Sequence, residues 1–145
     1  MTEMTAHLEY GRSILAAQPF SALVGAELTH FSDGNAEITI KIIESLKQQH
    51  GFVHGGVISY AADNALTFAG GSILGSGVVT SEFKINYMRP ALGSHLIARA
   101  SVIHAGKSQA VCRCDVLTLS EQGERLCATA QGTISKLGEP SAAGA

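Results

Sequence analysis

The spacing of apolar residues predicts one long helix among several strands. Residues 54–71 place apolar side chains at helical spacing around nearly the whole circumference, which indicates a helix enclosed by other structure. Other segments alternate apolar and polar side chains, and this two-residue period predicts strands with one buried face. These alternating segments are residues 36–42, 78–88, 95–104, 109–119 and 124–136.

The N-terminal part is predicted to form a peripheral helix and a hairpin. Residues 7–17 contain enough Leu, Ile and Ala for a helix, which Pro19 ends. Residues 21–31 are apolar and are predicted to be extended, and the turn at 33–35 leads into the strand at 36–42. Further along, Gly70-Gly71 is predicted to stop the long helix, because glycine adopts the left-handed conformation without steric cost.

These elements predict an α+β fold of one domain. Many inward positions of the later strands are Ala, Gly or Cys, and such small residues let a sheet curl closely around a helix. We therefore expect a curved antiparallel sheet of about five to six strands around the central helix. Residues 1–18 are expected to be a tail with the peripheral helix, 19–137 the domain, and 138–145 a disordered tail.

Composition narrows the classes of function. The net charge of −2 over 145 residues gives no electrostatic reason to expect nucleic acid or an anionic membrane as partner. The N-terminus lacks the features of a signal peptide, and no apolar run is long enough to span a membrane, so we expect a cytoplasmic protein. Cys112, Cys114 and Cys127 are odd in number and lie in alternating segments, which indicates reduced core residues.

A carboxylate interrupts the apolar helix and requires an explanation. Ser59, Asp63 and Thr67 are spaced four apart and form one polar stripe. A carboxylate on a buried helix costs several kcal/mol unless it is paired or hydrogen-bonded. Asp63 is therefore either a catalytic base or nucleophile, or a structural aspartate that is hydrogen-bonded across an interface.

The start of the helix, His54-Gly55-Gly56, provides a second chemical feature. Free N–H groups at a helix N-terminus can hold an oxyanion, and two glycines allow close approach to the backbone, although they also suit a simple tight turn. Gly55 and Asp63 are eight residues apart, which separates them by about 12 Å along the helix axis. They cannot contact the same carbonyl group. If both act, Asp63 must come from a second subunit whose helix runs antiparallel across a two-fold axis.

The motif Gln48-x5-His54-Gly55-Gly56-x6-Asp63, followed by TSEFKINYMRPA at residues 80–91, resembles the hotdog-fold acyl-CoA thioesterases. The group that it resembles is the phenylacetate-pathway-like one, and the likeness extends over about residues 19–136. The resemblance implies a central helix wrapped by the sheet, with two chains joined edge to edge. It also implies composite active sites and homodimers that commonly pair into homotetramers.

The resemblance also implies roles for individual residues. The Gly55 N–H would hold the thioester carbonyl, with His54 and Gly56 as neighbours, and Asp63 of the partner would act as base or nucleophile. His54 could serve as an acid, but its position also suits a helix cap. The amide of Gln48 would hold water or the thioester, and Thr80, rather than Ser81, would bond the water or the carboxylate.

The predicted substrate is an acyl-CoA, and no metal or separate cofactor is required. The CoA phosphates call for cationic or backbone donors, for which Arg89 and the turn Gly106-Lys107-Ser108 are the candidates. The acyl group is left open by the sequence. Two alternatives to a thioesterase are a hotdog dehydratase or hydratase, which generally pairs a catalytic His with a carboxylate, and a non-catalytic acyl-CoA-binding module.

Overall fold

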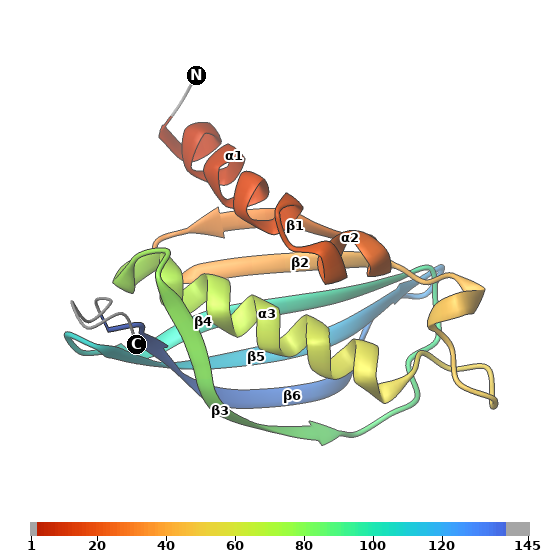
Figure 1. Ribbon diagram of the computed structural model, residues 1–145. Coiled ribbons are helices and arrows are strands. Elements are labelled where there is room, and N and C mark those ends of the chain that lie inside the picture. Colours follow the sequence, from red (N-terminus) through yellow and green to blue (C-terminus); the bar gives the residue numbers. More distant parts are fainter. Residues whose placement is uncertain (1–2, 139–145) are drawn as a thin grey trace.

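A computed structural model describes residues 3–138 of the chain (Figure 1). Its helices are α1 (Glu3–Ala16), α2 (Pro19–Val24), a short 3-10 helix (Glu44–Leu46) and α3 (Gly55–Leu74). Its strands are β1 (Ala26–Ser32), β2 (Asn35–Lys41), β3 (Val78–Tyr87), β4 (His95–Ala105), β5 (Gln109–Ser120) and β6 (Gly123–Lys136). The disordered tail predicted for 138–145 lies, apart from its first residue, outside the described residues, and so do residues 1–2.

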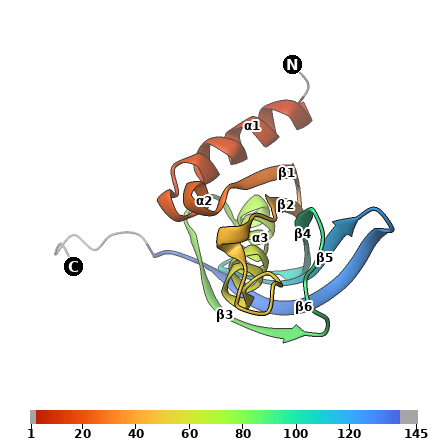
Figure 2. The same ribbon diagram turned by 90° about the vertical axis from the view of Figure 1, so that its right-hand side faces the viewer.

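The strands form one antiparallel sheet that curls around α3, which confirms the predicted architecture (Figures 1 and 2). The strand order is β1-β2-β4-β5-β6-β3. Helix α1 lies over the β1 edge, where Arg12 Nε donates to the Leu28 carbonyl at 3.0 Å. Among the described residues nothing pairs with the other edge of the sheet, which is formed by β3.

Two predictions for the N-terminal region are wrong. The first helix begins at Glu3 instead of residue 7, and residues 21–24 belong to helix α2 instead of an extended strand. Pro19 suits the first turn of a helix because the missing N–H would be unpaired there anyway. Gly25, with φ of 76°, ends α2, so that β1 begins only at Ala26.

The predicted end of the long helix is also wrong. Helix α3 continues through Gly70-Gly71 to Leu74 and ends at Gly75, whose φ is 102° and whose N–H donates to the Gly71 carbonyl at 2.8 Å. Gly70 instead serves close packing of α3 on β6, since a Cβ atom there would lie 2.7 Å from Ile134 Cβ. A glycine that packing requires inside a helix thus has the same local sequence pattern as a helix end.

The core lies between α3 and the concave face of the sheet, and small residues dominate it. Ala61, Ala62, Ala65 and Ala69 of α3 are all buried. The three cysteines are buried, which confirms their predicted place in the core, and none is bonded to another. The apolar–polar alternation of residues 124–136 predicts that Leu126 faces inward together with Ala128 and Ala130, and this prediction is wrong. A register shift in the β5–β6 pairing leaves Leu126 40% exposed and buries the adjacent Cys127.

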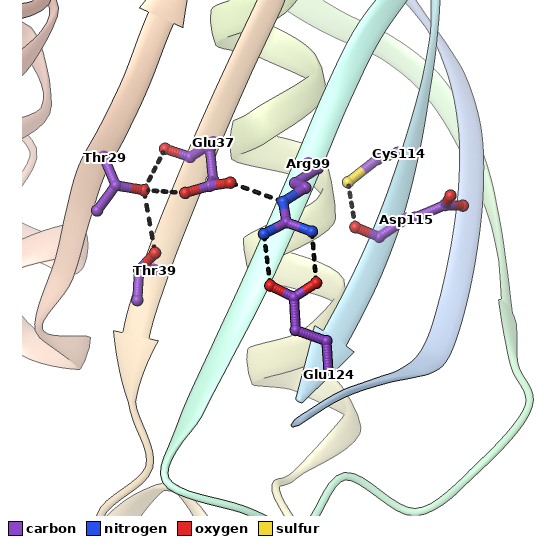
Figure 3. A network of polar contacts seen from close by, with 7 residues as sticks. All are labelled: Thr29, Glu37, Thr39, Arg99, Cys114, Asp115 and Glu124. Atoms are coloured by element: carbon purple, nitrogen blue, oxygen red, sulfur yellow. Dashed lines mark hydrogen bonds and ion pairs between the residues drawn. The ribbon is translucent and has the colours of Figure 1, made fainter. Parts of the chain in front are cut away.

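The outer face of the sheet carries a network of charged side chains (Figure 3). Arg99 on β4 donates to Glu37 on β2 at 2.7 Å and forms two further hydrogen bonds of 2.7 Å with Glu124 on β6. Burial raises the pKa of Glu37, but hydrogen bonds from Arg99 and Thr29 outweigh that effect and leave this pKa lowered. The network therefore links four strands, because Thr29 belongs to β1.

Candidate active site

Asp63 lies in the middle of α3, where β3 crosses the helix, and its carboxylate is held by a hydroxyl group. Thr80 Oγ1 donates to Asp63 Oδ1 at 2.6 Å. Among the residues that the structure describes, Asp63 forms no salt bridge. Asp63 and Thr80, which are 17 positions apart in the sequence and were both predicted to belong to the site, thus lie in direct contact. The catalytic roles of both residues stay predictions.

A second hydroxyl group, that of Thr67, completes this cluster. Thr67 Oγ1 lies 2.8 Å from Thr80 Oγ1 and donates to the backbone carbonyl of Asp63 at 2.9 Å. Thr67 belongs to the predicted polar stripe of the helix, but no role in the site was predicted for it. The signal that could have found it is the four-residue spacing from Asp63, which puts both side chains on one face of the helix.

The backbone N–H of Gly55 is free at the start of α3. The neighbouring N–H of Gly56 donates to His54 Nδ1 at 2.8 Å, so His54 is the N-cap of the helix. No residue between 3 and 138 accepts a hydrogen bond from the Gly55 N–H, whereas the Gly55 carbonyl accepts one from Tyr87 Oη at 3.2 Å. One donor at the positive end of a 20-residue helix therefore remains for a ligand.

Gln48 lies in the loop that leads into α3. The Lys47–Val53 bridge closes this loop, and the His54 N–H donates to the Leu46 carbonyl at 2.8 Å, so the loop folds back against the helix start. Gln48 Oε1 accepts a hydrogen bond from the His50 N–H. The carboxamide NH2 group of Gln48 has no acceptor in the described part of the chain and can still donate to a ligand.

The residues predicted to bind CoA lie at two separate positions in the chain's fold. Arg89 lines a hollow of about 320 Å³ that also includes Gly55, Tyr87 and Met88. The turn Gly106-Lys107-Ser108 lies at the other end of β3, because the Ser108 carbonyl accepts from Lys136, which pairs with Val78. The ten residues of β3 span about 30 Å, so Arg89 and this turn cannot contact one phosphate group within a single chain.

The Gly55 N–H and the Asp63 carboxylate are likewise separate in one chain. Gly55 and Asp63 both lie on α3, and their eight-residue separation corresponds to about 12 Å along the axis. Gln48, His54, Gly55 and Gly56 form one group at the helix start, and Asp63, Thr67 and Thr80 form the other. Neither group alone contains both a backbone N–H of the helix start and a carboxylate.

The cysteines provide no alternative nucleophile. Burial raises the pKa of Cys112 and Cys127 to about 11 and that of Cys114 to about 12, so these thiols stay protonated at neutral pH. Within residues 3–138 no three His, Cys, Asp or Glu side chains gather as metal ligands would. None of the described helices is both long and apolar enough to cross a membrane.

Comparison with solved structures identifies the architecture as the hotdog fold. A thioesterase family protein from Silicibacter pomeroyi superposes with a TM-score of 0.83 at 33% identity, covering 87% of this chain and 94% of that one. The model of the thioesterase superfamily matches residues 50–127, and the chain belongs to this superfamily.

Named relatives in the same superfamily match over most of their length. The acyl-coenzyme A thioesterase PaaI of Escherichia coli is 28% identical over 116 residues, which cover 79% of this chain and 80% of PaaI. The 1,4-dihydroxy-2-naphthoyl-CoA hydrolase of Listeria monocytogenes is 27% identical over 114 residues, or 77% of this chain and 90% of that protein.

Proposed function

We propose that the protein is an acyl-CoA thioesterase that hydrolyses a thioester to a free carboxylic acid and CoA. The observation that carries this proposal is the combination of an unpaired Gly55 N–H at a helix N-terminus with a carboxylate held by a hydroxyl group. Thioester hydrolysis needs an oxyanion donor and an activated nucleophile. The names of the relatives agree with this activity.

In the proposed reaction the Gly55 N–H donates a hydrogen bond to the thioester carbonyl oxygen, where negative charge develops. Asp63 either takes a proton from the attacking water and returns it to the leaving CoA thiolate, or attacks the carbonyl carbon itself. In the second case the CoA thiolate leaves and takes a proton from solvent, and water then hydrolyses the resulting acyl–aspartyl anhydride to the free acid and the Asp63 carboxylate. Thr80 orients the carboxylate through its 2.6 Å hydrogen bond, and the Gln48 amide holds water or the thioester. The reaction needs no metal or cofactor.

We further propose that each site is shared by two chains of a homodimer. The separation of Gly55 and Asp63 along α3 supports this arrangement, and so does β3, whose outer edge is free in the described chain. A bare ten-residue edge is a template for pairing with another strand. If two β3 strands pair antiparallel, Arg89 of one chain approaches the 106–108 turn of the other, and both can bind CoA phosphates.

We expect such dimers to pair into homotetramers. The dehydratase alternative would require a catalytic His paired with the carboxylate, but the Nδ1 atom of His54 accepts a hydrogen bond from the Gly56 N–H, so this ring serves as the helix cap. In a non-catalytic binding module, Asp63 would have neither a cation partner in the described chain nor a catalytic role to offset the free-energy cost of its position. Both considerations favour the hydrolase.

The proposal is tested by following thiol release from a panel of aryl- and alkyl-CoA esters. Asp63→Asn and Asp63→Ala should each lower turnover at least about a hundredfold while size-exclusion chromatography shows an unchanged dimer. Asp33→Asn, in the exposed β1–β2 turn, is the matched control and should hydrolyse the esters as the parent does. The proposal is wrong if the parent hydrolyses no ester, or if the Asp63 variants are as active as the parent.

A further inference from the structure

Tyr87, the last residue of β3, lies against the start of α3. Its Oη atom donates a hydrogen bond of 3.2 Å to the Gly55 carbonyl. Its ring also covers Gly55, since a Cβ atom at that position would lie 3.6 Å from the nearest ring carbon. Both residues line the same hollow of about 320 Å³. No role in the site was predicted for Tyr87.

The direction of the Tyr87 side chain follows from the alternation along β3. Phe83, Ile85 and Tyr87 share the strand face that packs on α3. Phe83 and Ile85 are partly buried against the core, whereas Tyr87 is 54% exposed. Burial therefore accounts for little of the position of Tyr87. In the described chain its hydroxyl group has one hydrogen-bond partner, the Gly55 carbonyl.

The backbone that carries Tyr87 is anchored on two sides. The N–H groups of the two residues that follow it both donate to the Cys127 carbonyl, at 2.8 and 3.2 Å, which ties the end of β3 to β6. The Val53 N–H donates to the Ala91 carbonyl at 3.1 Å, which ties the segment after β3 to the loop before α3. Tyr87 is thus held at a fixed place beside the helix start.

The helix start needs support from outside because it contains two glycines. Glycine has no Cβ atom and adopts many backbone conformations, so Gly55 and Gly56 do not fix the direction of their own peptide groups. The peptide group between them is bonded on both sides instead, because Tyr87 bonds its carbonyl and its N–H donates to His54 Nδ1 at 2.8 Å. The free Gly55 N–H belongs to the adjoining peptide group, which shares the Gly55 Cα atom. Holding the carbonyl therefore also restricts the direction of this N–H.

We propose that Tyr87 is a positioning residue for the oxyanion donor. By holding the Gly55 carbonyl, its hydroxyl group keeps the Gly55 N–H directed at the place where the thioester oxygen becomes negative. A donor that is fixed before the reaction stabilises the transition state most, because no reorganisation is then needed. The inference rests on the proposed thioesterase function, since only that function gives the Gly55 N–H a catalytic role.

The test is Tyr87→Phe, which keeps the ring and removes the hydroxyl group. With the ester that the parent hydrolyses fastest, kcat should fall about 5- to 20-fold while KM changes less than about twofold, because an oxyanion donor acts mainly on the transition state. Tyr10→Phe is the matched control, since Tyr10 is a similarly exposed tyrosine on α1. It should hydrolyse the ester as the parent does.

A double-mutant cycle with Gly55→Pro shows whether Tyr87 acts through the Gly55 N–H. Gly55→Pro removes this N–H and keeps the backbone carbonyl of the same position. In that background Tyr87→Phe should lower kcat less than about twofold, because no donor is left to position. A role of Tyr87 in folding or in binding the ester would lower the activity equally in both backgrounds.

The outcomes separate this inference from the proposed function. If the parent hydrolyses an ester and Tyr87→Phe matches it, or if only KM changes, the inference is overturned and the thioesterase proposal stands. Equal losses of kcat with and without Gly55→Pro also overturn it. If the parent hydrolyses no ester, the proposed function fails and this inference fails with it.

Discussion

At the scale of single residues, Asp63 is held by a hydroxyl group and by no cation of the described chain. A structural aspartate on a buried helix is expected to have an ion-pair partner, because an uncompensated charge is costly there. Within the described chain Asp63 receives a hydrogen bond from Thr80 on Oδ1 and no cation lies within salt-bridge distance. One carboxylate oxygen is therefore oriented, and the other remains available to a water molecule.

Thr80 should act as a positioning residue for this carboxylate. Thr80→Val removes the 2.6 Å hydrogen bond to Asp63, so kcat should fall about 10- to 100-fold with little change in KM, because a misplaced carboxylate slows the chemical step. Thr80→Ser should recover most of the rate. The control is Ser81→Ala, since Ser81 bonds Ser135 on β6 instead. Equal kcat losses in the Thr80 and Ser81 variants would contradict this role.

The identity of this hydroxyl could not be derived from strand alternation. Phe83 and Ile85 face the helix, and strict alternation would place Ser81 beside them. The β3–β6 register shifts between Thr80 and Glu82, so Ser81 is the extra residue of a bulge and Thr80 turns toward α3. Only the family resemblance pointed to Thr80, because no local signal marks the bulge.

The free N–H of Gly55 can be removed without breaking the helix. Gly55→Pro places proline at the first position of α3, where it is well tolerated, and His54 already has the extended conformation that precedes proline, with ψ of 135°. We expect kcat/KM to fall about 10²- to 10³-fold, the usual effect of losing one oxyanion donor. Gly55→Ala is the matched variant, because its Cβ meets Tyr87 at an ordinary 3.6 Å and its N–H is kept. It should lose far less activity. Similar losses in both variants would argue against the donor.

At the scale of elements, the strands themselves could be predicted from the sequence, but not all of their pairing partners. The segments that became β4, β5 and β6 are joined by short turns, and local hairpin signals suffice to pair them. Strand β3 pairs with β6, more than forty residues away along most of the ladder, and no local signal encodes such a pairing. Helix α2 was missed for a different reason: its six residues are too few to show a clear helical period.

Gly70 is expected to be required for the packing of α3 on β6. Gly70→Ala would put a Cβ 2.7 Å from the β-branched Ile134, and overpacking of this kind costs about 1–3 kcal/mol, partly offset by the better helix propensity of alanine. Urea unfolding should show a net loss of about 1 kcal/mol or more. Gly71→Ala, whose nearest neighbour would be Val78 at 3.3 Å, should be close to neutral. If Gly70→Ala is as stable as Gly71→Ala, the packing argument is wrong.

The Arg99 network should make the stability of the sheet depend on pH. Hydrogen bonds from Arg99 lower the pKa of Glu37, despite its burial, and that of Glu124 below the ordinary value of 4.5. Their contribution is therefore complete well above this pH and is lost as the pH falls through the lowered pKa values. Arg99→Met should lower the urea midpoint at pH 7, and the difference from the parent should shrink at pH 3. A difference that stays constant with pH would mean that packing, not charge, is responsible.

At the scale of the whole molecule, the two parts of the proposed site are separate in a single chain. The Gly55 N–H and the Asp63 carboxylate lie about 12 Å apart along α3, and the outer edge of β3 has no partner strand in the described chain. A two-fold axis beside β3 would address both features, since pairing the edge also brings α3 of one chain against α3 of the other. Catalysis and dimerisation would then depend on the same interface.

This arrangement is tested by mixing two inactive variants. A dimer of Gly55→Pro with Asp63→Asn has one site in which both groups are intact and one in which both are altered. If subunits mix at random, half of the dimers are mixed and about a quarter of the parental activity should return. Two affinity tags would allow the mixed dimer to be purified, and it should have about half of the parental activity. Variants of one residue, such as Asp63→Asn with Asp63→Ala, should show no recovery. If purified mixed dimers stay inactive, Gly55 and Asp63 do not act across the interface.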